Sequence, residues 1–119
     1  KRRGHTLAVA TSRMGRSYRM YMEMFGLDGL FDVEVTMEDV STHKPDPEAI
    51  LVTLDKLGAD ADDAIMLGDT RFDIGCANNA GVDSVLVKWS HYVDMEQMAT
   101  LGYEPTYVID SPEELLEIV

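Results

Sequence analysis

The stretch AIMLGDTRFDIGCANNAG, residues 64–81, decides the fold. Residues 64–67 are a short apolar run, which is typical of a buried strand. Gly68 gives the backbone the freedom to turn sharply after that strand. Residues 71–80 then predict a helix, which the glycine at position 81 ends. A buried strand that passes directly into a helix indicates the α/β class with parallel strands.

The same alternation continues on both sides of this unit. The predicted strands are 7–11, 31–36, 64–67, 84–87 and 106–109, and the predicted helices are 16–25, 46–57, 71–80, 93–101 and a last one from 111. This order predicts one domain with a mainly parallel sheet between two layers of helices, a three-layer α/β sandwich. In sheets of this kind, ligands bind beyond the carboxyl ends of the strands.

The helices carry three specific expectations. Asp46 is predicted to cap the helix that follows it, with a proline as the first helical residue. Ser111 and Glu114 have the spacing of a capping box, which predicts reciprocal hydrogen bonds at the start of the last helix. The apolar stripe of helix 46–57 is predicted to consist of Ile50, Leu51, Leu54 and Leu57.

Composition narrows the function classes. The 119 residues carry a formal net charge of −12, which disfavours nucleic acid and anionic lipid surfaces as partners. A phosphate site in such a chain needs its own local positive charge. The single cysteine cannot form an internal disulfide, so a reducing compartment, the cytoplasm, is the simpler expectation. No apolar run approaches the ~20 residues of a membrane span.

Two carboxylates follow the strand at residues 64–67. Asp69 comes at its carboxyl end and Asp73 falls in the first turn of the next helix, so both can converge above the sheet. Mg²⁺ prefers hard oxygen ligands, often one or two carboxylates with water and a substrate phosphate. The same spacing also fits a structural role, with Asp69 or Thr70 as the helix N-cap and Asp73 as a first-turn acid.

Candidate phosphate ligands follow an earlier strand and lie in a proline-rich loop. Thr11 and Ser12 come at a strand end before a helix, where hydroxyl and backbone N–H groups suit a phosphate, although a plain N-cap is the alternative. Lys44 lies between His43 and two prolines, which stiffen the loop and can aim its ammonium group at a phosphoryl group. The alternative for Lys44 is a solvated loop lysine.

Taken in order, these motifs resemble the haloacid dehalogenase superfamily of phosphatases, in the branch close to phosphoglycolate phosphatases and pyrophosphatases. The motifs are Thr11-Ser12, Lys44-Pro45, and the block Gly-Asp-x3-Asp-Ile-x4-Asn-Ala-Gly over residues 68–81. The resemblance covers nearly the whole chain and implies a Rossmann-like core. It also implies that Thr11 binds phosphoryl oxygens with Ser12 nearby, that Lys44 neutralises charge, and that Asp69 and Asp73 help to hold Mg²⁺.

The resemblance implies a mechanism in which an aspartate nucleophile forms an aspartyl-phosphate and a second aspartate acts as general acid and base. The Asp-x-Asp-Gly-Thr motif that carries both is absent here, and so is the cap domain that usually follows it. In the family this motif lies on the central strand, so the strands of this chain are expected to flank a gap. Either a preceding segment or another chain is expected to complete the sheet.

We therefore expect the chain to be the C-terminal part of a phosphatase core that is inactive by itself. Residues 1–4, three basic residues and a glycine, resemble the end of a helix, and a trimmed basic tail is the alternative. A non-catalytic binding or regulatory module with the same core is the second hypothesis. A flavodoxin-like receiver is the third, although its acidic pair comes early in the chain. The substrate, a small phosphorylated compound, stays open among phosphoglycolate, pyrophosphate, sugar phosphates and nucleotides.

Overall fold

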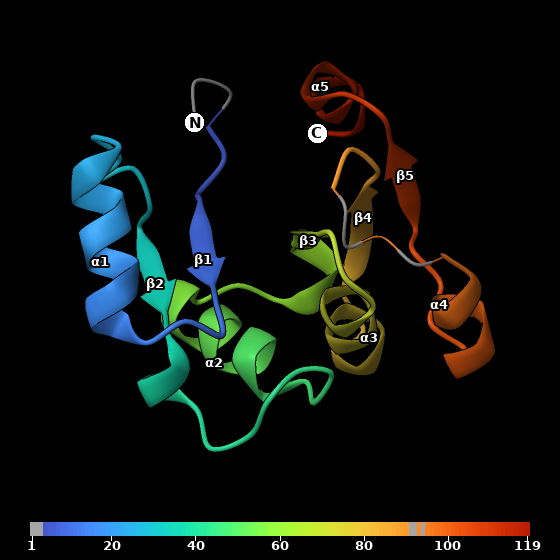
Figure 1. Ribbon diagram of the computed structural model, residues 1–119, viewed down its shortest axis with the longest axis horizontal. Coiled ribbons are helices and arrows are strands. Elements are labelled where there is room, and N and C mark those ends of the chain that lie inside the picture. Colours follow the sequence, from blue (N-terminus) through green and yellow to red (C-terminus); the bar gives the residue numbers. More distant parts are fainter. Residues whose placement is uncertain (1–3, 91–92, 94) are drawn as a thin grey trace.

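The structure is a computed structural model that describes residues 4–90, 93 and 95–119 (Figure 1). In chain order the strands and α-helices are β1 (Ala8–Ala10), α1 (Gly15–Met24), β2 (Val33–Val35), α2 (Glu48–Leu57), β3 (Ile65–Gly68), α3 (Arg71–Ala80), β4 (Asp83–Val87), α4 (Met95–Leu101), β5 (Tyr107–Ile109) and α5 (Leu115–Ile118). Short 3₁₀ turns span Met37–Asp39, Ala61–Asp63 and Pro112–Glu114.

The strands form two parallel sheets. β1 pairs with β2, and β3, β4 and β5 pair in that order, with β4 in the middle. Within the described part of the chain, no strand pairs with the remaining edge of β1 or of β3. The α/β class with parallel strands is therefore confirmed, and the strands flank a break in the sheet as expected.

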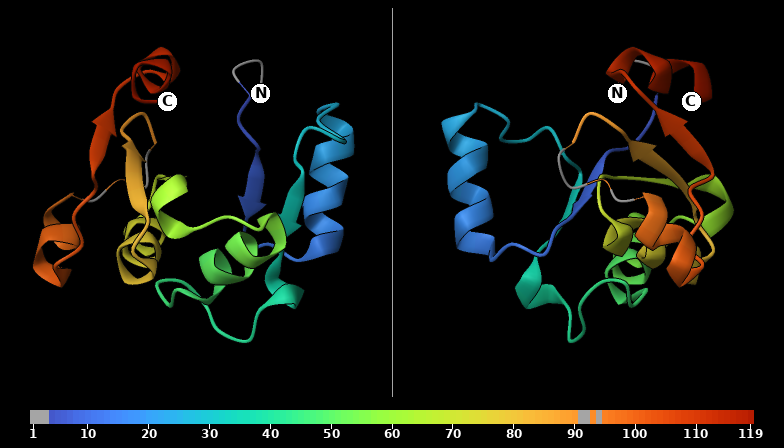
Figure 2. Two further views of the ribbon diagram at one scale, coloured as in Figure 1. Left: turned by 180° about the vertical axis from the view of Figure 1, so that it is seen from behind. Right: turned by 45° about the vertical axis from the view of Figure 1, so that its right-hand side comes forward.

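Helices α2 and α3 connect the two sheets by packing against each other. α2 also contacts β1 and β2, whereas α3 contacts β3 and β4 (Figure 1). Ile50 and Leu54 of α2 meet Cys76 and Ala77 of α3 in one apolar cluster. Figure 2 shows α1 on the opposite side of the β1–β2 pair from α2, so helices cover these strands on both sides. A second cluster, around Ile74, Leu86 and Met98, joins α3 and β4 to α4.

The strand predicted over residues 64–67 forms one residue later and is less buried than expected. Leu67 is 40% exposed, and none of the four residues of β3 is fully buried. By contrast, Val85 and Leu86 on β4 are completely buried. β4 has a partner on each side and β3 has one on a single side, which accounts for the difference.

Two expectations for α2 are wrong in detail. The helix begins at Glu48, so Pro47 is the N-cap residue and not the first helical residue. The Asp46 carboxylate nevertheless accepts a hydrogen bond of 3.0 Å from the Glu48 N–H, which satisfies one of the free donors at the helix start. Leu51 is half exposed, and the buried face carries Thr53 instead.

The capping box predicted near the C-terminus does not form. The Ser111 side chain makes no capping hydrogen bond, and a 3₁₀ turn precedes α5. The Glu114 carboxylate accepts the N–H of Asp110 at 2.9 Å, one residue earlier than a capping box requires. α4 begins at residue 95, and part of its predicted start, residue 94, lies outside the described residues, as do residues 1–3. Among the described residues, no helix is long and apolar enough to cross a membrane.

Candidate functional site

The connection between β3 and α3 is a tight turn that only glycine permits. A Cβ atom on Gly68 would lie 2.2 Å from the Cβ of Asp73, because the first turn of α3 folds back over the end of β3. This close approach places the Asp73 carboxylate directly at the strand end. The sequence prediction that Asp69 and Asp73 converge at this edge agrees with that geometry.

The Asp73 side chain takes part in the cap of α3 and in an ion pair. Thr70 is the N-cap of α3: its hydroxyl accepts the Asp73 N–H at 3.3 Å and donates to Asp73 Oδ2 at 3.1 Å. The same oxygen accepts the Asp69 N–H at 3.3 Å. The capping role therefore uses one carboxylate oxygen of Asp73 and leaves Oδ1 directed toward Lys44.

Lys44 is an ion-paired lysine and not the solvated loop lysine of the alternative reading. Its Nζ lies 2.8 Å from Asp73 Oδ1 and donates to the Ala10 carbonyl at 2.8 Å. The side chains of Lys44 and Asp73 are only 10% and 15% exposed. Lys44 thus ties the end of β1 to the start of α3 and places a positive charge between the two sheets.

The loop before α2 is held from two directions. The Glu48 carboxylate accepts the backbone N–H groups of Ser41 and Thr42, and these bonds hold the pKa of Glu48 below its ordinary value. On the other side, Asn79 of α3 donates to the carbonyl of Pro45 at 2.9 Å. These contacts fix the backbone on both sides of Lys44.

Thr11 and Ser12 lie between β1 and α1, but neither caps the helix. The N-cap of α1 is Met14, and the N–H of Gly15 donates to the Glu38 carboxylate at 2.8 and 3.1 Å. That carboxylate occupies the place at the helix start where a phosphate could bind, so the helix-terminus argument for a phosphate is wrong here. The Thr11 hydroxyl accepts the Arg13 N–H at 3.1 Å, and its own proton is left to donate.

All five predicted site residues line one cavity of about 510 Å³ between the ends of β1 and β3. Thr11 and Ser12 contribute from one sheet, Asp69 and Asp73 from the other, and Lys44 from the loop between them. Ala10, Met66, Leu67, Gly68, Thr70 and Phe72 complete the lining. The cavity therefore brings together two carboxylates, three hydroxyls and one ammonium group.

The oxygen donors suit a hard divalent cation, although they are few. Within the described residues, no group of three or more His, Cys, Asp and Glu side chains could hold a metal ion. Asp69 and Asp73 supply two carboxylates, which fits the one or two that Mg²⁺ commonly takes with water and phosphate oxygens. Any further oxygen ligand of a cation at this site must come from a group other than Asp69 and Asp73.

Sequence reasoning missed two contacts of the site. Ser90 follows β4, and its hydroxyl donates to Asp69 Oδ2 at 2.7 Å. The rule that ligands collect beyond strand ends could have identified it. Phe72, 43% exposed, lies under the Arg71 guanidinium at 4.4 Å and lines the cavity. Trp89, the residue before Ser90, is half exposed and does not line the cavity.

The chain is similar to known proteins over nearly its whole length. A family model described as haloacid dehalogenase-like hydrolase matches residues 1–87. The chain is 34% identical to pyrophosphatase PpaX of Bacillus velezensis over 119 residues, which cover 99% of this chain and 53% of that protein. It is 35% identical to pyrophosphatase PpaX of Halalkalibacterium halodurans over 116 residues, or 98% of this chain and 53% of that protein. The chain thus spans about half the length of the curated relatives it matches.

Solved structures agree with these sequence matches. A phosphatase of the same superfamily from Thermococcus onnurineus aligns with a TM-score of 0.81 and 28% identity, covering 97% of this chain and 50% of that one. A superfamily hydrolase from Geobacter sulfurreducens aligns with a TM-score of 0.80 and 27% identity, covering 96% of this chain and 52% of that one. In both cases the shared part is half of a larger protein.

Proposed function

Because the chain belongs to the haloacid dehalogenase-like hydrolase family, we propose that it forms the phosphate- and metal-binding half of a Mg²⁺-dependent phosphatase. One observation carries this proposal: Thr11, Ser12, Lys44, Asp69 and Asp73 line a single cavity although they come from three separate parts of the chain. The substrate is a small phosphorylated compound. The names of the PpaX relatives make inorganic pyrophosphate the first compound to assay.

Each polar group of the cavity has a place in phosphoryl transfer, which depends on positioning and charge neutralisation. Lys44 uses two N–H donors on Asp73 and the Ala10 carbonyl, and an ammonium group has three. Its third donor is available to a phosphoryl oxygen. The Thr11 hydroxyl donates to the same group, with Ser12 close by. Asp69 and Asp73 would hold Mg²⁺, whose positive charge would offset the negative charge of the phosphoryl group.

The nucleophile must come from residues that this sequence does not contain. We propose that a strand carrying an aspartate nucleophile lies between β1 and β3, supplied by another segment of the protein or by another chain. The open edges of these two strands support this placement, since a parallel strand there would satisfy backbone groups on both sides. Its aspartate would enter the cavity next to Lys44 and form an aspartyl-phosphate. The chain alone is then expected to be inactive.

A non-catalytic binding module is the second candidate, and the absence of an Asp-x-Asp-Gly-Thr motif from this sequence favours it. Such a module would bind phosphate or Mg²⁺ without hydrolysing a substrate. The two candidates differ in one measurable property, which is turnover by the longest natural protein that contains this chain.

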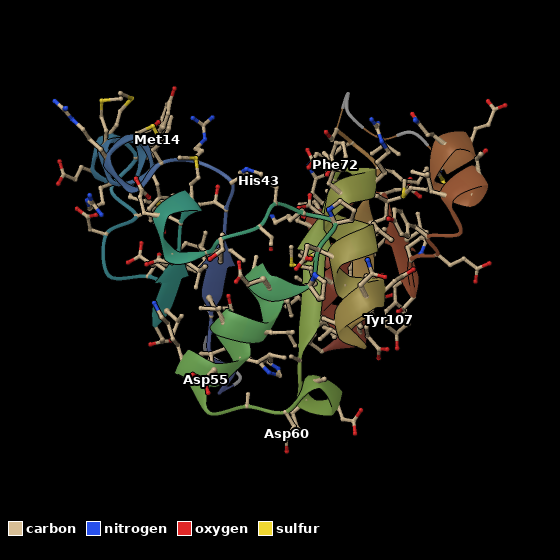
Figure 3. The ribbon with its side chains drawn as sticks, turned by 90° about the horizontal axis from the view of Figure 1, so that it is seen from below. Met14, His43, Asp55, Asp60, Phe72 and Tyr107 are labelled. Atoms are coloured by element: carbon tan, nitrogen blue, oxygen red, sulfur yellow. The ribbon has the colours of Figure 1, made fainter. Side chains whose placement is uncertain are left out.

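The deciding experiment measures p-nitrophenyl phosphate and pyrophosphate hydrolysis by that protein with and without Mg²⁺. Asp69→Asn is expected to lower activity at least ~100-fold, because charge stabilisation by a metal is worth several kcal/mol. Asp55→Asn is the matched control, since Asp55 is exposed on α2. Figure 3 shows Asp55 far from Phe72, which lines the cavity. Full activity of Asp69→Asn would refute the metal site, and the absence of turnover in the parent protein would favour the binding module.

A further inference from the structure

We propose that Ser90 is a positioning residue that orients the Asp69 carboxylate for a divalent cation. The inference rests on the proposed function, because it assigns a new residue to the metal site of that function. Ser90 lies 21 residues after Asp69, and its hydroxyl donates to Asp69 Oδ2 at 2.7 Å. An ionised carboxylate only accepts hydrogen bonds, so the serine must be the donor.

The pairing of β3 with β4 brings these two side chains together. Gly68, the last residue of β3, lies opposite Leu86 of β4, and Asp69 follows directly. The chain after β4 stays paired for one more residue, because the Lys88 N–H donates to the Ile109 carbonyl at 3.0 Å. Ser90 lies two residues farther along, in the turn that follows β4. The pairing of β4 with β3 and β5 anchors the start of this turn beside Asp69.

The hydrogen bond selects one orientation of the Asp69 carboxylate. A carboxylate at the end of a short side chain rotates about a broad torsion, so a single fixed oxygen determines the plane of the group. With Oδ2 bound to Ser90, Oδ1 is left for a cation, and no hydrogen bond from the described residues reaches it. Hydrogen-bonded partners of metal ligands commonly raise metal affinity by holding the ligand in this way.

The contrast with Asp73 explains why Asp69 needs such a partner. Asp73 is held by Lys44, Thr70 and the backbone of Asp69. The described structure provides Asp69 with one side-chain hydrogen bond, the bond from Ser90. Without that hydroxyl, the bound cation alone would have to orient the Asp69 carboxylate.

The test titrates Mn²⁺, as a spectroscopic probe for the divalent site, into the longest natural protein that contains this chain, and follows free Mn²⁺ by electron paramagnetic resonance. Ser90→Ala is expected to weaken Mn²⁺ binding ~10-fold, as loss of such partners does elsewhere. Ser90→Thr keeps a hydroxyl at the same position and is expected to bind like the wild type. Ser41→Ala, an exposed serine in the loop before Lys44, is the matched control.

Each outcome decides one point. Equal Mn²⁺ affinity in Ser90→Ala and the wild type overturns the role of Ser90 while the metal site stands. Weak binding in Ser90→Thr, with unfolding temperature unchanged, also overturns it, because the hydroxyl would then not be the active feature. If the wild type and Asp69→Asn bind Mn²⁺ equally, the metal site itself fails and the proposed function loses its basis. A lower unfolding temperature of Ser90→Ala without a change in affinity would indicate a purely structural contact.

Discussion

At the scale of single residues, Asp73 uses one side chain for both a helix cap and an ion pair. Its Oδ2 completes the cap of α3 with Thr70, while its Oδ1 pairs with Lys44 at 2.8 Å. A carboxylate has about four lone-pair sites, so these bonds do not exhaust it. The structural role of Asp73 therefore leaves room for the metal-ligand role that we propose for the same side chain.

The Lys44–Asp73 pair is expected to contribute measurably to stability because it is largely shielded from water. Lys44→Met leaves the Asp73 carboxylate without its cation, which should lower the free energy of unfolding by about 3 kcal/mol. This value lies at the low end for broken buried pairs, since Asp73 keeps two other hydrogen bonds. Urea unfolding of the chain measures the change.

The double variant Lys44→Met/Asp73→Asn is the control for that prediction. It removes both charges, so it is expected to recover part of the lost stability. If Lys44→Met unfolds at the same urea concentration as the wild type, the pair is merely a surface contact and the lysine is not fixed in the way the distances indicate.

At the scale of elements, α1 is attached to the rest of the fold through a carboxylate. Glu38, in the turn after β2, accepts the N–H of Gly15 at the start of α1 and the hydroxyl of Thr36. The Gly15 N–H, with further help from Thr36 and Arg19, holds the pKa of Glu38 below its ordinary value of 4.5. A negative charge at this position also suits the helix dipole.

This contact predicts an acid-sensitive attachment of α1. A carboxyl group whose pKa is lowered by folding stabilises the protein above about pH 4.5 and loses that contribution as the pH falls through the lowered value. Glu38→Gln is expected to flatten the decline in the free energy of unfolding as the pH falls below 4.5, the ordinary pKa of this carboxyl group. Urea unfolding at several pH values measures it, with Glu23→Gln on the same helix as the control. A decline as steep as that of the wild type would contradict the assignment.

At the scale of the whole molecule, the main feature is the break between β1 and β3. Among the described residues, the packing of α2 on α3 and the Lys44–Asp73 ion pair join the two sheets across the break. Hydrogen bonds from α3 to the loop before α2, such as the bond from Asn79 to the Pro45 carbonyl, add to them. Leu67 and Phe72 are exposed beside it, as expected where a neighbouring strand would cover them. In a chain with a formal net charge of −12, Lys44 supplies a local positive charge beside the break.

The break predicts a gradient of hydrogen exchange. Amide hydrogens of β4, which is paired on both sides, should exchange most slowly, and those of β1 and β3 should exchange faster. Mass spectrometry of the deuterated chain measures this order. In the longest natural protein that contains the chain, β3 should become as protected as β4 if a strand fills the break. Equal protection of β3 and β4 in the isolated chain would show that the open edge is satisfied in another way.

Local chemistry let the sequence by itself determine most of the fold and select five residues that line one cavity. Apolar runs and glycine stops located the strands and helices to within a few residues, because each depends on neighbours along the chain. The order of Thr11, Lys44, Asp69 and Asp73 indicated the family, because order along the chain is read directly from the sequence. Local patterns did not predict the hydrogen bonds at helix starts. The Gly15 N–H donates to Glu38, which lies in a distant turn. Glu114 accepts the N–H of Asp110 and not that of Ser111.

Only the tertiary structure decided how these residues meet. The pairing of Lys44 with Asp73 across 29 residues, and of Ser90 with Asp69 across 21, depends on which strands lie next to each other. Strand neighbours are set by the packing of the whole chain, which leaves no short-range signal in the sequence. The exposure of β3 was unpredictable for the same reason, since burial of a strand depends on the partner beside it and not on its own residues.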